Sequence, residues 1–212
     1  MVNNVASEWS DIYSTEPKAL PKMDSVIMTD STLYVSKFVE WLNVDEFELL
    51  YRGTRDGMSL KAFHKRCDNQ GPTLTLARND KGHIFGGYFS VPWTSPAKGS
   101  YRQSPNSFLF TLTNMYNIPP TKFDLKDKND GYATYHCKSC GPVFGSGYDI
   151  YIGLSADKQL SGSRFPTAYN DTTGKGCSIF TSDLGMDTFA VNEIEVYKVI
   201  MPIRRTSLFS FV

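Results

Sequence analysis

A glycine-rich segment that runs into an alternating pattern constrains this chain most: residues 141–153, GPVFGSGYDIYIG. Glycine is used where the backbone needs a positive φ or passes close to another segment. The alternation in residues 149–152, DIYI, is typical of a half-buried strand. Residues 83–90, HIFGGYFS, also place glycines among strand-forming aromatics, which indicates a bend or a close backbone approach. We expect these two segments to form the bent centre of a β-rich core.

Length and composition indicate one ordinary globular domain. The 212 residues are enough for a substantial core, and 41% of them are hydrophobic. Lys+Arg and Asp+Glu number 22 each, which argues against a nucleic-acid-binding protein, because such proteins carry a basic face. No apolar stretch is long enough for a transmembrane segment, and the N-terminus lacks the pattern of a signal peptide. With four scattered cysteines and no disulfide framework, we expect a reduced, cytoplasmic protein.

Local patterns predict two early helices and several strands. Apolar residues at helical spacing predict a helix over 31–43, and Ser59 is a suitable N-cap for a second helix. Strands are predicted within 47–52, 73–78, 83–90, 107–113, 132–137 and 189–200. The polar stretch 155–187 is expected to be a long surface excursion. These elements predict an α+β fold, an antiparallel two-sheet β-sandwich with short flanking helices.

The chain divides into three parts by composition. Residues 1–29 have no sustained period and are expected to form an N-terminal arm, either extended on the domain or disordered. Residues 30–200 carry the predicted helices and strands and form the domain. Residues 201–212 form a C-terminal tail.

Seven sequence blocks in a fixed order resemble one known family. They are LLYRGTRDG (49–57), FHKRCDNQGPTL (63–74), IFGGY (84–88), Trp93, SFLFTL (107–112), GPVFGSGYDIYI (141–152) and EIEVY (193–197). Their order and spacing resemble the TLDc domain, over roughly residues 30–200. The resemblance implies a fold of two packed antiparallel sheets. It also implies roles in protection from oxidative stress and in binding and regulating the vacuolar-type proton ATPase. No accepted catalytic mechanism comes with the family, so the resemblance implies no catalytic residues and no cofactor.

Cys137 and Cys140 depart from the family pattern, which usually has small polar or aromatic residues there. The spacing His136-Cys137-x-x-Cys140 can bind zinc or form a redox pair. A structural zinc site needs four ligands, and the other candidates are scattered without a second CxxC: Cys67, Cys177, His64 and His83. No helix start follows the two cysteines, as a thioredoxin-like pair would require. We expect no metal and no redox function here.

Two groups of residues are candidates for interaction with a partner. Glu193 and Glu195 share one face of the last predicted strand, where they are expected to lie on a solvated outer face or to form a docking edge for a basic partner. The tail carries apolar side chains that we expect to be buried on the domain itself or on a partner: Leu208, Phe209, Phe211 and Val212.

The sequence therefore supports three hypotheses of function. The first is a non-enzymatic TLDc-type interaction module that binds the vacuolar-type proton ATPase, either free in the cytoplasm or held at the cytosolic face of a membrane through a protein complex. The second is a structural or accessory subunit of a larger intracellular assembly, anchored through its terminal arms. The third is a thiol- or metal-dependent enzyme centred on Cys137 and Cys140.

Overall fold

The computed structural model describes residues 19–28, 31–129, 131–154, 160–183 and 187–202. In this part of the chain four helices are formed: α1 (Ser31–Leu42), α2 (Gly53–Asp56), α3 (Leu60–Cys67) and α4 (Ser178–Thr181). The strands of the first half of the chain are β1 (Glu46–Arg52), β2 (Thr73–Asn79), β3 (Ile84–Phe89), β4 (Ser100–Arg102) and β5 (Phe108–Thr111). Those of the second half are β6 (Thr121–Asp124), β7 (Thr134–His136), β8 (Val143–Phe144), β9 (Ile150–Tyr151), β10 (Leu160–Gly162) and β11 (Thr188–Ile200).

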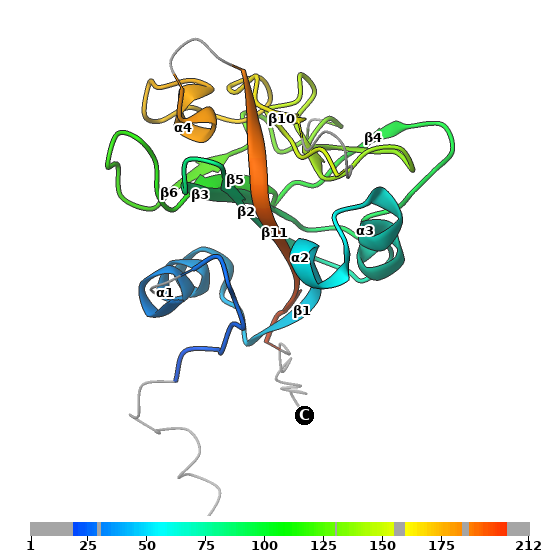
Figure 1. Cartoon of the computed structure of the whole chain (residues 1–212), viewed down its shortest axis with the longest axis horizontal. Coiled ribbons are helices and arrows are strands. Elements are labelled where there is room, and N and C mark those ends of the chain that lie inside the picture. Colours follow the sequence, from blue (N-terminus) through cyan, green and yellow to red (C-terminus); the bar gives the residue numbers. More distant parts are fainter. Residues whose placement is uncertain (1–18, 29–30, 130, 155–159, 184–186, 203–212) are drawn as a thin grey trace, which may run out of the picture.

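The strands form one large antiparallel sheet around β11. Its order is β4-β7-β8-β9-β10-β11-β2-β3-β5-β6, with β1 also paired to β11. The start of β11 pairs with β10, and its end pairs with β1, where Glu46 lies opposite Ile200. Figure 1 shows β11 as the long orange strand through the middle of the molecule. The α+β class with mostly antiparallel strands is confirmed, whereas the expected division into two sheets is wrong. The 13-residue β11 is long enough to hydrogen-bond to both groups of strands and joins them.

The two helices predicted early in the chain are confirmed, and each has a local cause. In α3 the Ser59 side chain accepts a hydrogen bond from the backbone N–H of Ala62 at 3.2 Å, which satisfies a free donor of the first turn. In α1 the apolar residues at helical spacing bury Phe38 against the sheet, where its ring packs edge-on to Phe110 at 5.2 Å. This helix covers one face of the sheet.

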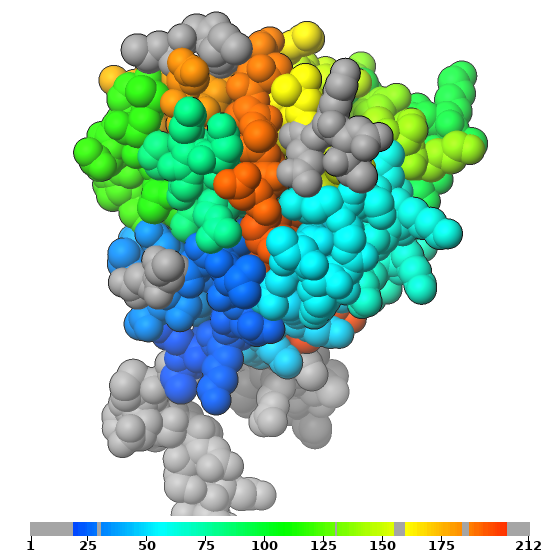
Figure 2. Space-filling view, in the orientation of Figure 1, coloured from blue at the N-terminus to red at the C-terminus, as the bar shows by residue number. Residues whose placement is uncertain are grey.

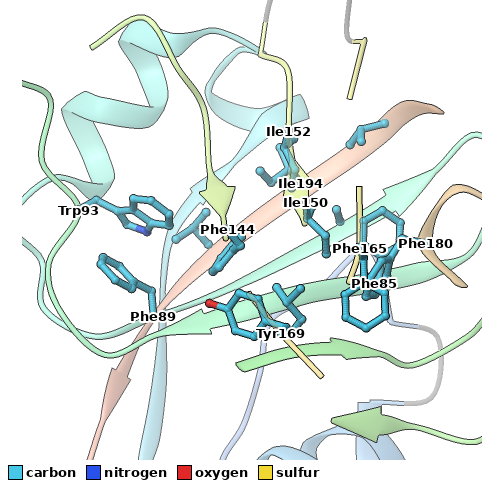
Figure 3. Close-up of a cluster of buried hydrophobic side chains, with 14 of the residues drawn as sticks. Phe85, Phe89, Trp93, Phe144, Ile150, Ile152, Phe165, Tyr169, Phe180 and Ile194 are labelled. Atoms are coloured by element: carbon cyan, nitrogen blue, oxygen red, sulfur yellow. The ribbon is translucent and has the colours of Figure 1, made fainter. Parts of the chain in front are cut away.

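A large apolar cluster lies on the opposite face of the sheet from α1. Here the short strands β8 and β9 fold back over β2 and β3, so that Phe144 packs against Trp93 with ring centroids 5.7 Å apart. Figure 3 shows Phe144 and Ile150 among the buried aromatics of this cluster. The close approach is possible because a Cβ on Gly87 would lie 2.7 Å from the Phe144 ring. The bent, glycine-containing core expected from the sequence is present.

The segment after β9 is part of this core and not a surface excursion, so that expectation is wrong for the described residues 160–183. Its large apolar side chains are buried: Phe165, Tyr169, Ile179 and Phe180. Asp149, itself buried, fixes the segment by accepting hydrogen bonds from the backbone N–H groups of Thr167 at 2.5 Å and Ala168 at 2.9 Å. Burial raises the pKa of Asp149, and these hydrogen bonds oppose the rise. Asp149 thus ties residues 167 and 168 of this segment to the core by hydrogen bonds within the chain.

Candidate functional site

Glu195 lies in the interior and is saturated by groups of its own chain. Its side chain is 0% exposed. Its carboxylate accepts hydrogen bonds from Arg52 Nε at 2.7 Å, Ser25 Oγ at 2.6 Å, the Val26 backbone N–H at 2.9 Å and the Tyr197 hydroxyl at 2.8 Å. We call these five residues the Glu195 clasp. The clasp fixes the segment before α1 onto the end of β11.

Glu193 is also buried, at 1% exposure. It accepts hydrogen bonds from the Thr54 hydroxyl, from the Thr54 backbone N–H at 3.2 Å and from the Ile194 backbone N–H at 2.9 Å. In Figure 2 the orange band of β11 passes under the cyan residues around α2. The expected solvated outer face is therefore wrong, because α2 and residues 24–26 cover it. Neither carboxylate is free to meet a basic partner.

The electrostatics of the Glu195 clasp fit a fixed ion pair. Burial alone would lower the pKa of Arg52, but the hydrogen bonds and negative charges of Glu195 and Asp24 together outweigh this effect and raise the pKa. Burial raises the pKa of Tyr197, and the negative charge of Glu195 adds to the rise. Arg52 stays cationic and Tyr197 stays a neutral donor. A charged pair held this way is expensive to break from one side, at about 3 to 5 kcal/mol.

Cys137 and Cys140 lie at a turn after β7. The backbone N–H of Cys140 donates to the carbonyl of Cys137 at 3.1 Å, and Cys137 Sγ lies 2.9 Å from Ser139 Oγ. Hydrogen bonds from Ser139 lower the pKa of the Cys137 thiol, whereas burial raises the pKa of Cys140 to about 11. In the described chain no three His, Cys, Asp or Glu side chains are grouped to hold a metal ion. The turn brings the two thiols together without completing a ligand set.

His136, the neighbour of Cys137, points the other way, into the core. Its ring packs against Trp93 with centroids 5.0 Å apart, and its Nδ1 accepts a hydrogen bond from the Thr94 backbone N–H at 3.1 Å. Burial lowers the pKa of His136 to about 4. An accepting Nδ1 requires the neutral ring, in agreement with this shift. His64 contacts the cysteine turn from α3, with Nε2 3.0 Å from the Cys140 carbonyl oxygen.

An open hollow of about 440 Å³ lies beside the cysteine turn, on the outer face of β8 and β9. Its lining is mostly apolar: Leu60, Ser139, Cys140, Gly141, Val143, Tyr148, Tyr151, Ile152, Gly153, Leu154, Leu160 and Arg164. Arg164 is the one basic side chain in this lining. Small-molecule and peptide sites are commonly apolar hollows with a few polar groups that fix orientation. This is the candidate docking surface of the described chain.

A row of partly exposed tyrosines continues from the hollow across the short strands. Adjacent ring centroids lie 4.9 to 6.1 Å apart along the series Tyr132, Tyr101, Tyr135, Tyr148 and Tyr151, which we call the tyrosine row. Tyr101 and Tyr135 are directly opposite each other on β4 and β7. Tyr132 is 49% exposed. Tyr148 has a φ of 65°, which is uncommon for a bulky residue and is often found at functional positions.

The sequence did not indicate this surface. The tyrosines come from three separate segments, and each alone is typical of an ordinary half-exposed strand or turn residue. The usable signal was the outward position of Tyr151 in the DIYI alternation, with Ile150 and Ile152 inward.

The tail candidates Leu208, Phe209, Phe211 and Val212 lie outside the described residues, so their predicted burial stays a prediction.

Fold and site together define a class of protein. The described chain is a β-rich α+β domain whose buried carboxylates Glu193, Glu195 and Asp149 are satisfied internally and whose short strands carry the tyrosine row. Within the described residues no helix is long and apolar enough to cross a membrane.

The chain belongs to the TLDc domain family. The family model described as the TLDc domain matches residues 22–200. This match confirms the resemblance seen in the sequence blocks. It begins close to the residues of the Glu195 clasp, Ser25 and Val26, which the structure places on the domain. No curated protein sequence matches the chain.

Proposed function

We propose that this protein is a non-enzymatic interaction module that binds and regulates the vacuolar-type proton ATPase and thereby contributes to protection from oxidative stress. The observation that carries the proposal is membership of the TLDc family over residues 22–200. The action takes place at the cytosolic face of the membrane that holds the ATPase. The protein reaches this face through a protein contact.

The arrangement of polar groups supports a binding role. The strongest buried charges, Glu195 and Asp149, are saturated by hydrogen bonds that fix segments of the fold. The exposed chemistry lies in the tyrosine row and the adjoining hollow. Tyrosine is enriched at protein interfaces because a rigid ring buries much area at little cost in conformational entropy.

Recovery of the partner from the protein's own cells tests the proposal. The tagged full chain is purified from these cells, and subunits of the proton ATPase are expected among the recovered proteins. Proton pumping by isolated membranes is then measured with and without the purified chain. Failure to recover the ATPase, together with unchanged pumping, would overturn the proposal.

Two deletions distinguish the proposed regulator from the alternative, a structural subunit anchored by its terminal arms. Residues 1–18 and 203–212 are removed in separate variants, which leaves the Glu195 clasp intact. A visiting regulator keeps ATPase binding in both variants. Lost binding with an unchanged melting temperature would favour the structural subunit.

A further inference from the structure

We propose that the tyrosine row and the adjoining hollow bind an acidic, extended segment of a protein partner, with a partner carboxylate on Arg164. This inference deepens the proposed function and rests on it, because it gives the docking site of the interaction module and the chemistry of what docks there. Four features of the surface carry it: shape, apolar lining, charge and the position of Arg164.

The row is a continuous series of ring contacts, which favours an extended occupant. The tyrosines follow one another at ring spacings of 4.9 to 6.1 Å over the outer face of β4, β7 and β9. Side chains on one face of an extended strand recur about every 6.6 to 6.8 Å. Successive outward side chains of an extended segment can therefore pack on successive tyrosine rings.

The row is held in place before any partner arrives. The Tyr101 hydroxyl donates to the carbonyl oxygen of Ser146 at 2.8 Å. Tyr135 packs over Gly99, where a Cβ would overlap its hydroxyl oxygen. The carbonyl of Tyr148 accepts a hydrogen bond from the Arg164 backbone N–H at 3.0 Å. Because these rings are already ordered, binding loses little side-chain entropy.

The charges on and beside this surface favour an anionic occupant. Arg164 lines the hollow, and Lys138 lies in the cysteine turn next to it. Lys138 is linked to the chain before β4 by its backbone N–H, which donates to Pro96 at 3.2 Å. Of the acidic residues on the same described segments, Asp149 is buried and hydrogen-bonded. Asp187 is exposed at the Tyr151 end of the row, where its backbone carbonyl lies against Gly162. Arg164 lines the hollow together with Tyr148 and Tyr151, whereas the carboxylate of Asp149 is withdrawn into the core.

Arg164 is the most specific of these groups. Its side chain is exposed, and no described residue forms a hydrogen bond or ion pair with its guanidinium. It stands among apolar side chains such as Leu154 and Leu160, where a carboxylate would be partly shielded from water. A guanidinium prefers two parallel hydrogen bonds to a carboxylate. The expected ligand therefore has an Asp or Glu beside one apolar side chain that enters the hollow.

The test selects ligands for the full chain from a random ten-residue peptide display library. We expect the enriched peptides to carry net negative charge and an acidic residue next to Leu, Ile or Phe. The affinity of the most enriched peptide is then measured by fluorescence anisotropy. Arg164→Glu and Tyr135→Ser should each weaken binding by at least tenfold, whereas Tyr135→Phe should keep it and Arg164→Lys should lose part of it.

Matched controls separate the site from general effects. Lys81→Glu reverses an exposed charge in the β2–β3 turn and should leave the affinity within twofold. Melting temperatures of all variants must match the parent chain, so that lost binding is not lost folding. Enrichment of basic or purely apolar peptides, or equal binding by Arg164→Glu, would overturn the inference.

Two other occupants give distinct results, and both would overturn it. A second copy of the chain would appear as self-association without peptide that Tyr135→Ser abolishes. The chain's own tail would appear as tighter peptide binding after removal of residues 203–212. Failure of the peptide selection with the ATPase still recovered rejects only this inference. Acidic peptide binding without ATPase recovery rejects only the identity of the proposed partner.

Discussion

The long-stranded half of the sheet (β1, β2, β3, β5, β6 and β11) and the short-stranded half (β4 and β7–β10) are held together differently. In the long-stranded half continuous ladders join the strands, and the Glu195 clasp adds one saturated ion pair. In the short-stranded half the strands have two or three residues, and side chains such as Asp149 fix the connections between them.

This difference explains where exposed chemistry can occur. Long ladders with both faces covered leave little room for an unpaired polar group, because burying such a group is costly. In β7 and β9 the outward positions stay partly exposed, as Tyr135 and Tyr151 do. Surface residues in such segments can vary with little loss of fold stability. The long-stranded half supplies the scaffold, and the short-stranded half supplies the surface.

The largest expected loss of stability comes from a substitution that disrupts the strand pairing of the long-stranded half. A Cβ on Gly86 would overlap the carbonyl oxygen of Thr75 on the neighbouring strand. Gly86→Ala should therefore lower the free energy of unfolding by more than about 4 kcal/mol, since β2 and β3 must separate. Denaturant unfolding measures this change. The control is Gly131→Ala, where a Cβ meets nothing within 4 Å, and equal stabilities of the two variants would contradict the prediction.

The second effect opens the Glu195 clasp. Glu195→Ala leaves Arg52 without its buried partner and should cost about 3 kcal/mol of unfolding free energy. Glu48→Ala, which removes an exposed carboxylate from β1, should change it by less than about 0.5 kcal/mol. Chemical denaturation of both variants at pH 7 makes the comparison. A loss below about 1 kcal/mol for Glu195→Ala would mean that the clasp contributes little.

The third effect is a pH dependence from His136 in the short-stranded half. Burial lowers its pKa from 6.5 to about 4, so between these values the unfolded chain binds a proton that the folded chain does not. The contribution of His136 to the free energy of unfolding is therefore largest above pH 6.5. It decreases as the pH falls and is about 2 kcal/mol smaller at pH 5. The non-titrating His136→Gln should show a smaller loss between pH 7.5 and pH 5. Parallel stability profiles for the two proteins would contradict this.

The smallest effect is expected at the cysteine turn. Replacement of both Cys137 and Cys140 by Ser should change the unfolding free energy by less than about 0.5 kcal/mol, because the turn lies at the surface of the short-stranded half. Recovery of the proton ATPase should also be unchanged. Stoichiometric zinc in the purified parent chain, or clear unfolding of the double variant, would favour the thiol or metal hypothesis.

Much of the fold could be predicted from local pattern. Ser59 marked the start of α3, the apolar spacing marked α1, and the strands predicted within 73–78 and 83–90 form the antiparallel pair of β2 and β3. The ordered sequence blocks identified the family, which the family model confirms. These features succeed because caps, turns and periodicity are properties of neighbouring residues.

The features that failed depend on residues far apart in the chain. Alternation in β11 correctly placed Ile194 and Val196 inward, but it carries no information that Arg52 and Ser25 return to cover Glu195. Likewise, whether strands form one sheet or two depends on how many neighbours β11 accepts. The tyrosine row joins side chains of separate segments, so no local window contains it.

The position of β11 in the chain has a consequence for how the molecule is made. Among the described strands β11 comes last in chain order, and yet it pairs with β1, β2 and β10. During synthesis β1, β2 and β10 therefore emerge before β11, the strand with which they all pair. Until β11 follows, their apolar faces and strand edges are exposed. Proteins dominated by such distant strand pairings fold slowly, and their unpaired strand edges are prone to aggregation. The nascent chain should depend on chaperones until β11 has emerged from the ribosome.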